Sequence, residues 1–149
     1  MKTWILLIAT ILLLCSSVAR ADGLEDSVEA YNKGNYAQAL ELLRPLANQG
    51  IATAQNNLGW MYDVGKGVAQ DYQEAVKWYR LAAEQGYAAA QNNLGVMYVK
   101  GKGITQDHVR ARMWFNFAAN KGDTNAKESR DRTAKEMKPY QIANAQRMT

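Results

Sequence analysis

The triplet Gly101-Lys102-Gly103 has residue types that can bind phosphate, and the same triplet occurs earlier as Gly65-Lys66-Gly67. Backbone N–H groups of a glycine-rich loop and a lysine ammonium together hold phosphate oxygens. A phosphate loop of this kind also needs a preceding strand and a Ser or Thr directly after the lysine. Glycine follows the lysine in both triplets, and the flanking residues have a helical pattern. We therefore predict that these glycines end a helix and turn the chain through positive φ values.

Residues for nucleophilic or metal-assisted catalysis are scarce in this chain. His108 is the only histidine and Cys15 the only cysteine, and no pair of carboxylates stands out from the surrounding pattern. A catalytic triad needs a nucleophile, a base and an orienting group, and a zinc site needs several His or Cys ligands. We therefore expect His108 to be a surface residue, and we expect a protein that is not an enzyme and uses no metal or cofactor.

The first 21 residues have the layout of a secretory signal peptide. Lys2 supplies a positive charge, the run from Trp4 to Cys15 is almost entirely apolar, and Ala19 and Ala21 are small residues at the −3 and −1 positions of a cleavage site. A transmembrane helix needs about 20 apolar residues, so this run is short for one. We predict cleavage after Ala21 and a periplasmic or secreted protein, with an uncleaved anchor or a lipoprotein as alternatives. The mature chain then has no cysteine, and hence no disulfide.

Charge is distributed unevenly along the chain. Residues 22–99 contain five Lys/Arg against nine Asp/Glu, whereas residues 100–149 contain eleven against five. A basic end attracts anionic partners such as lipid headgroups or acidic proteins. The simpler interpretation is a solvated surface that ends in a basic cap.

An internal repeat organises the chain. Shifting the sequence by 36 residues aligns residues 51–86 with 87–122, and 19 of the 36 positions are identical. A fixed period of this length is typical of a solenoid. Each unit predicts two helices. The apolar stripe of the first helix is Ala54, Leu58 and Tyr62, and that of the second is Ala75, Trp78, Tyr79, Ala82 and Ala83.

The boundaries and the packing of these helices also have sequence signals. Asp71 is placed to cap the start of the second helix, and Gly86 to end it. Gly59 and Gly95 lie inside first helices, where glycine costs about 1 kcal/mol relative to alanine. We expect the bulky Trp and Tyr side chains of the second helix to fill the space beside them.

The units extend beyond the obvious pair. We divide the chain into a signal peptide (1–21), an N-terminal hairpin (22–50) with a first helix over 24–33, two full repeats (51–86 and 87–122), and C-terminal capping helices (123–149). In the capping segment a first helix is predicted over 123–138, with Arg130 and Asp131 at the Leu–Gly positions, and Pro139 opens a final helix. The fold class is therefore all-α, a solenoid of about three and a half helical hairpins.

The unit A-x-x-x-L-G-x-x-Y-x-x-G-x-G-V-x-x-D-x-x-x-A-x-x-W-Y-x-x-A-A-x-x-G runs from Ala54 to Gly86 and recurs from Ala90 to Gly122 with Ile104 and Phe115 as mild replacements. It strongly resembles the Sel1-like repeat, a relative of the tetratricopeptide repeat. The resemblance implies a right-handed α-solenoid that serves as a protein–protein adaptor. Some exported relatives are cysteine-rich and have been linked to penicillin binding, a link that the cysteine-free mature chain does not support.

In the geometry that the resemblance implies, first helices line a concave binding face. The positions that face inward there are Thr53, Asn56, Trp60, Asp63 and Val64 in one unit, and Ala89, Asn92, Val96, Val99 and Lys100 in the next. Trp60 is the most informative of them, because aromatic residues anchor interfaces. The alternative is that Trp60 packs against the preceding hairpin. Asn56 and Asn92 are placed either to hold the backbone of a peptide or to bond neighbouring repeats.

Three functions remain open at this stage. The first is an exported adaptor whose concave face binds a protein or peptide. The second is an envelope module that contacts anionic lipid or polymer through a basic end, comprising Arg110, Arg112, Lys127, Arg130, Arg132, Lys135 and Lys138. The third, for which no catalytic residues are apparent, is a hydrolase of cell-wall-related amides. We expect a protein or peptide partner, at most weak membrane-surface contact, and no nucleic acid.

Overall fold

A computed structural model describes residues 22–149, and the predicted signal peptide lies outside the described residues. These residues form helices and connecting turns, with no strand among them. The first helix covers residues 22–32 of the described chain. It is followed by α2 (Tyr36–Asn48), α3 (Ala52–Val64), α4 (Tyr72–Glu84), α5 (Ala88–Lys100), α6 (His108–Asn120), α7 (Thr124–Ala134) and α8 (Pro139–Arg147).

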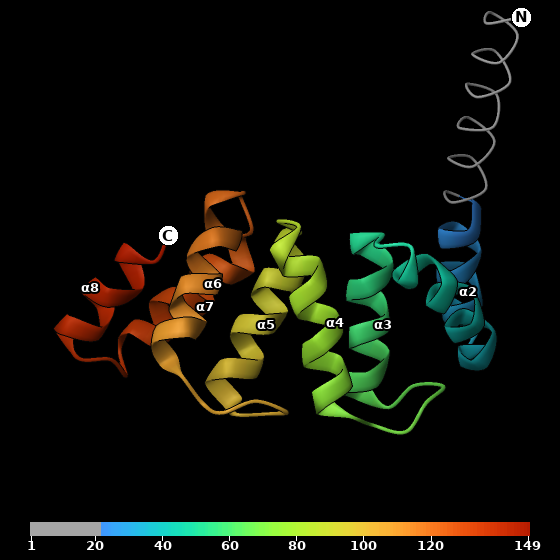
Figure 1. The fold of residues 1–149 in the computed structure, drawn as a ribbon, viewed down its shortest axis with the longest axis horizontal. Coiled ribbons are helices and arrows are strands. Elements are labelled where there is room, and N and C mark those ends of the chain that lie inside the picture. The colour runs from blue at the N-terminus through green and yellow to red at the C-terminus, as the bar shows by residue number, and fades with distance from the viewer. Residues whose placement is uncertain (1–21) are drawn as a thin grey trace, which may run out of the picture.

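The helices stack pairwise into a solenoid, which confirms the predicted all-α class. Helices α3 and α4 form one hairpin and α5 and α6 the next, and α4 packs on α5 between them. In the same way α2 packs on α3, and α6 on α7. Figure 1 shows the helices following one another along the long axis, with residues 22–32 and α2 at one end and α8 at the other. Each unit therefore contacts chiefly its neighbours, as in other repeat proteins.

Asp and Gly residues fix the limits of the helices, as predicted. The Asp71 carboxylate accepts hydrogen bonds from the backbone N–H groups of Gln73 and Glu74, which would otherwise be unpaired at the start of α4. Asp107 and Asp123 cap α6 and α7 in the same manner. At the other end of the first helices, Gly65 and Gly101 adopt the left-handed conformation, with φ of 71° and 64°.

The glycines inside the first helices allow an aromatic ring to approach the backbone. A Cβ atom on Gly59 would lie 2.9 Å from Cδ1 of Tyr79, and one on Gly95 would lie 2.5 Å from Cε1 of Phe115. Tyr79 and Phe115 are each 1% exposed. The structure thus confirms the close packing and selects Tyr79 over its neighbour Trp78, which is only partly buried.

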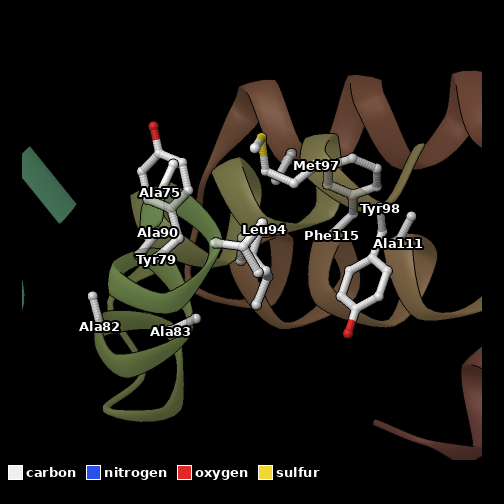
Figure 2. Packing of buried hydrophobic residues seen from close by; sticks show 13 residues of the cluster. Ala75, Tyr79, Ala82, Ala83, Ala90, Leu94, Met97, Tyr98, Ala111 and Phe115 are labelled. Carbon is white, nitrogen blue, oxygen red and sulfur yellow. The ribbon is translucent and has the colours of Figure 1, made fainter. Parts of the chain in front are cut away.

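The core is continuous from one unit into the next. One cluster of buried residues contains Tyr79 of α4, Leu94 and Met97 of α5, and Phe115 of α6 (Figure 2). A second cluster joins the N-terminal hairpin to α3 through Leu43, Leu46 and Leu58. Trp78 packs against this second cluster, so it seals the boundary with the preceding unit.

The C-terminal unit departs from the repeat, as the sequence suggested. Helix α7 covers Thr124–Ala134 and is four residues shorter at its C-terminal end than the predicted helix over 123–138. Residues 135–138 form a turn instead, and a residue that precedes proline, here Lys138, disfavours the helical conformation. Across residues 22–149, none of the helices combines the length and the apolar character needed to cross a membrane.

Candidate functional site

The two Gly-Lys-Gly loops each lie against the second helix of the preceding unit. A Cβ atom on Gly67 would lie 2.6 Å from the carbonyl oxygen of Tyr36, and a Cβ atom on Gly103 would lie even closer to the carbonyl oxygen of Tyr72. Only glycine fits such a contact at positive φ, here 72° and 66°. The loop therefore turns the chain, as predicted, and also fastens one unit to the one before it.

The lysines of these loops lie on tyrosine rings. Lys66 Nζ is 4.8 Å from the centroid of Tyr36, and Lys102 Nζ is 4.4 Å from that of Tyr72. Lys102 also donates a 3.0 Å hydrogen bond to the Tyr72 hydroxyl. This hydrogen bond raises the pKa of Lys102, against a small opposing effect of burial. Both lysine side chains thus already have partners within the protein. In a phosphate-binding loop, by contrast, the lysine side chain contacts the ligand.

A groove opens between the helix of residues 22–32 and α3. It has a volume of about 340 Å³. Its lining is mostly apolar and combines residues of three helices, namely Ser27, Val28, Tyr31, Leu43, Asn56, Asn57, Trp60 and Met61. Leu43 and Met61 are buried and form the base, whereas Val28 and Trp60 are exposed. Both helices that flank the groove are first helices of their units, so the groove lies on the type of face from which binding was predicted.

Trp60 is the main side chain of this groove. Its ring lies edge-on to Tyr31, with the ring centroids 5.2 Å apart, and 36% of the residue stays exposed. Tyr31 in turn contacts Tyr36 at a centroid distance of 5.0 Å. Trp60 therefore packs against the preceding hairpin and also presents apolar surface to solvent, while its role as an interface anchor stays a prediction.

Asn56 is engaged between repeats. It is 9% exposed, and its Oδ1 accepts a 3.0 Å hydrogen bond from Nδ2 of Asn93 in the next unit. Its own Nδ2 donates to Asn57 Oδ1 at 3.4 Å. Asn92, which corresponds to Asn56 in the second repeat, has a buried Oδ1 without a hydrogen-bond partner among residues 22–149. Of the two roles considered for Asn56, the structure shows the bond to a neighbouring repeat.

The other predicted site residues do not gather at this groove. Burial and, secondarily, the carboxylate of Asp63 raise the pKa of the Tyr79 hydroxyl. Val96 and Val99 pack against the core cluster of α4–α6. Thr53 is half-buried, while Val64 and Lys100 are exposed. Of the ten predicted inward-facing residues, the structure places only Asn56 and Trp60 in the groove lining.

Three of the eight residues that line the groove come from a helix for which the sequence predicted no binding role. Ser27, Val28 and Tyr31 come from the helix of residues 22–32. That helix lacks the letters of the full repeat, so the alignment gave no reason to inspect it. The aromatic residues around the short Gly34 turn, Tyr31 and Tyr36, were the available signal.

The proposed basic end is less exposed than its sequence suggested. Arg112 is only 8% exposed, and it donates a 3.1 Å hydrogen bond to the carbonyl oxygen of Arg130. Burial and, secondarily, the charge of Arg130 lower the pKa of Arg112. Arg130 itself is half-buried and donates from Nε to Asp131 at 2.9 Å. The expectation that Arg112 belongs to a surface patch is therefore wrong, because it packs between α6 and α7.

His108 lies at the start of α6 with a quarter of its side chain exposed, and its Nε2 is 3.8 Å from Oε2 of Glu136. Among residues 22–149, no group of three or more His, Cys, Asp or Glu side chains is arranged as metal ligands would be. The structure thus brings together an apolar groove and no cluster of reactive groups in the described part of the chain.

Comparison with known proteins agrees with this architecture. The family model for the Sel1 repeat matches the chain three times, over residues 21–51, 52–87 and 88–123. The chain belongs to the Sel1 repeat family. Sel1 repeat proteins are generally non-catalytic scaffolds, and repeats of this type typically mediate protein interactions. A search of curated proteins gives no match.

Two solved structures show the same fold. The first is c5321, described as a protective antigen present in uropathogenic Escherichia coli strains and displaying an SLR fold, with 34% identity and a TM-score of 0.83 over 87% of this chain and 28% of that one. The second is a Sel1 repeat protein from Oxalobacter formigenes, with 38% identity and a TM-score of 0.69 over 72% of this chain and 44% of that one. This Sel1 repeat chain therefore spans less than half the length of either relative.

Proposed function

We propose that this Sel1 repeat chain is an exported adaptor that binds a segment of another protein in the groove beside Trp60. The observation that carries the proposal is a tryptophan that stays 36% exposed at the wall of a 340 Å³ groove. Tryptophan is enriched among the residues that dominate protein–protein affinity, and such residues lie beside apolar pockets. Export is supported by the sequence pattern of residues 1–21 alone.

The groove favours an apolar side chain on the bound segment. Its base is formed by Leu43 and Met61, and its sides by Val28, Tyr31 and Trp60, without any charged residue in the lining. Leu, Met or an aromatic side chain of the partner would contact these groups without burying a charge. The half-buried amide of Asn57 is the polar group at hand to orient the partner's backbone, because the hydroxyl of Ser27 is buried and donates to the carbonyl of Leu24.

The second repeat supplies a conservative test variant. Val96 occupies the position that corresponds to Trp60, so Trp60→Val removes the aromatic wall while retaining a residue that the repeat already accommodates. Leu81→Ala on α4 is the matched control, because Leu81 is equally exposed at 39% and is absent from the groove lining. Both variants should retain the helical spectrum of the wild type.

The partner is best identified through the groove itself. A photo-crosslinking amino acid at position 28 should trap the bound segment in envelope extract, and a synthetic peptide of that segment then permits calorimetry. We expect Trp60→Val to weaken peptide binding by about tenfold or more, and Leu81→Ala to leave it unchanged. Equal binding by wild type and Trp60→Val would refute the groove as the site. Cell fractionation, with N-terminal sequencing that begins at Asp22, tests the export.

A further inference from the structure

The groove beside Trp60 contains polar side chains that are already hydrogen-bonded within the protein. Ser27 is 1% exposed, and its hydroxyl donates to the carbonyl oxygen of Leu24 at 2.6 Å. Asn56 donates to Asn57 on one side and accepts from Asn93 on the other. These contacts use the hydroxyl hydrogen of Ser27 and both functional groups of the Asn56 amide. Because both residues are buried, neither is placed to pair with the backbone of a bound segment.

The polar groups of the groove that have no hydrogen-bond partner among residues 22–149 are mostly donors. They are the Nδ2 group of Asn57, the indole Nε1–H of Trp60 and the hydroxyl of Tyr31, and of these only the hydroxyl can also accept. An extended segment presents an N–H and a C=O at every residue, and each needs a partner once it is buried. An α-helix pairs these backbone groups internally. The groove lining therefore suits a helix, and it leaves the N–H groups of an extended segment short of acceptors.

The two walls of the groove are helices that run in the same direction, because α2 returns the chain between them. Tyr31 of the helix of residues 22–32 and Trp60 of α3 are in ring contact at 5.2 Å. Val28 lies one turn before Tyr31 and Asn57 one turn before Trp60, so the walls continue along both helices. With 13 residues, α3 is about 20 Å long. A partner helix laid along the groove would contact it through residues spaced i, i+3, i+4 and i+7.

The part of the chain that forms the two walls is acidic. Residues 22–33 and 52–64 together contain five Asp/Glu against one Lys/Arg. The one lysine, Lys33, is paired with Glu29, whereas Glu25 forms no ion pair with any of residues 22–149. Glu25 and Glu29 line a neighbouring hollow that shares Val28 with the groove, so these carboxylates lie beside one of its walls. Basic residues that flank the apolar face of a partner would be attracted there.

We propose that the segment bound beside Trp60 is an amphipathic α-helix whose apolar face enters the groove and whose flanking residues are Lys or Arg. This inference rests on the proposed function, because it names the chemistry of the partner at the same site. The apolar face of the partner helix contacts Val28, Trp60 and the buried base of the groove, and its basic residues lie near Glu25 and Glu29. The partner helix keeps its own backbone hydrogen bonds, so the groove need supply none.

Three synthetic peptides of about 14 residues, long enough as helices to span α3, separate the features of the partner. The first has Leu at i, i+3, i+4 and i+7 with Lys and Ala elsewhere, and the second replaces each Lys by Glu. The third has the composition of the first, with Leu at alternate positions as in a strand. Fluorescence anisotropy with the purified full chain should show the first peptide binding about tenfold or more tighter than the other two. The Cα chemical shifts of the labelled first peptide should become helical on binding.

Matched variants of the protein show where the first peptide binds. Trp60→Val removes the aromatic wall and should weaken binding about tenfold or more. Glu25→Lys should reduce the preference for the Lys peptide over the Glu peptide about threefold or more, because it reverses a charge beside the groove. Glu84→Lys is the control, since it makes the same charge change at an exposed residue of α4 that is absent from the groove lining.

The results for the chemistry of the partner and for the groove itself can be told apart. If wild type binds the first peptide no better than the other two, the inference is overturned, and so it is if Trp60→Val retains the binding or if Glu25→Lys and Glu84→Lys act alike. The segment trapped by the crosslinker at position 28 gives the second comparison. A trapped segment that requires Trp60 but is extended or acidic overturns the inference and leaves the groove as the binding site. A trapped segment that Trp60→Val binds equally well refutes the groove, and the inference with it.

Discussion

The two full repeats, residues 52–87 and 88–123, use the same backbone but differ at pairs of positions that meet in space. In the first repeat the hydroxyl of the buried Tyr79 interacts with the carboxylate of Asp63, which contributes to the raised pKa of Tyr79. In the second, Phe115 replaces the tyrosine and Val99 the aspartate. A buried hydroxyl without a polar group nearby would cost free energy, so the hydroxyl and the carboxylate are present together in one repeat and absent together in the other. The comparison shows that substitutions between repeats are coupled through contacts.

The two repeats also differ in the hydrogen bonds of a buried glutamine, Gln55 in the first repeat and Gln91 in the second. Gln55 donates from Nε2 to the carbonyl of Ala47 at 3.1 Å, and its Oε1 accepts from Gln85 at 2.7 Å. Gln91 makes the equivalent bond to Ala83 at 3.1 Å, but its Oε1 is buried without a partner in the described chain. Lys121 occupies the position of Gln85 there and donates to the carbonyl of Gly86 instead. The first repeat is thus the more completely hydrogen-bonded of the two.

The largest effect is expected where the two repeats agree most closely. Gly59→Leu and Gly95→Leu each force a side chain into the aromatic ring of the following helix, and overpacking of this kind costs about 3 kcal/mol or more of unfolding free energy. Gly95→Leu should be the worse, because its Cβ would lie 2.5 Å from Phe115, against 2.9 Å from Tyr79 for Gly59→Leu. Urea and thermal unfolding measure both. An unchanged melting curve for either variant would contradict the packing.

The second-largest loss of stability is expected at the pair Asp63 and Tyr79, which the second repeat replaces by Val99 and Phe115. Asp63→Val leaves the buried Tyr79 hydroxyl without the carboxylate with which it interacts, and should cost about 2 kcal/mol of unfolding free energy. Tyr79→Phe in the same chain copies the pair of the second repeat and should recover part of that loss. A double-mutant cycle measures the coupling between the two sites. If the two single losses simply add, the hydroxyl and the carboxylate do not interact, and the explanation of the paired substitution fails.

The same pair predicts the behaviour of the protein in alkali. Burial, with Asp63 in second place, raises the pKa of Tyr79. A group whose pKa is higher in the folded state stabilises the fold fully below its unfolded pKa, which for tyrosine is about 10. That contribution is lost as the pH rises from about 10 toward the folded pKa. Wild type should therefore lose stability above this pH more steeply than Tyr79→Phe, as urea unfolding at a series of pH values would measure.

The glutamine contacts give a smaller difference between the repeats. Gln55→Met breaks two hydrogen bonds and leaves the amide of Gln85 without one of its acceptors, whereas Gln91→Met breaks one and removes an unpaired buried oxygen. We expect Gln55→Met to cost about 1 kcal/mol more unfolding free energy than Gln91→Met. Urea unfolding resolves a difference of this size. A greater loss of unfolding free energy for Gln91→Met would contradict the conclusion that the first repeat is the more completely hydrogen-bonded.

The fold was predictable because its signals are local and repeated. The period of 36 residues, the caps at Asp71 and Gly86, and the small-to-large packing of Gly59 all follow from residues one or two turns apart or one unit apart. The groove was not predictable in the same way. One of its sides is the helix of residues 22–32, which lacks most letters of the 36-residue unit, and the stacking of the units brings Tyr31 to Trp60.

The direction in which side chains point around the helix axis was the second feature that the sequence did not predict. Asp63 and Arg112 are charged, and the sequence alone places charges on the outside. Asp63 is instead half-buried and interacts with the buried Tyr79 of α4, and Arg112 donates to the carbonyl oxygen of Arg130 in α7. Both contacts are made to a neighbouring helix whose direction of approach is set by tertiary packing. Such partners become visible only once the helices are placed in three dimensions.

The smallest predicted effect concerns the Gly-Lys-Gly loops, where the first and second repeats differ in one hydrogen bond. Lys66 contacts the ring of Tyr36 only through its charge, whereas Lys102 both lies over Tyr72 and donates to its hydroxyl. Lys102→Met should lower the melting temperature by about 2 °C, and Lys66→Met by less. Tyr72→Phe separates the two contributions of Lys102, because it removes the hydroxyl and keeps the ring. If Lys102→Met has no effect in wild type but Tyr72→Phe does, the tyrosine hydroxyl acts through another contact, and the loop lysines are simply exposed charges.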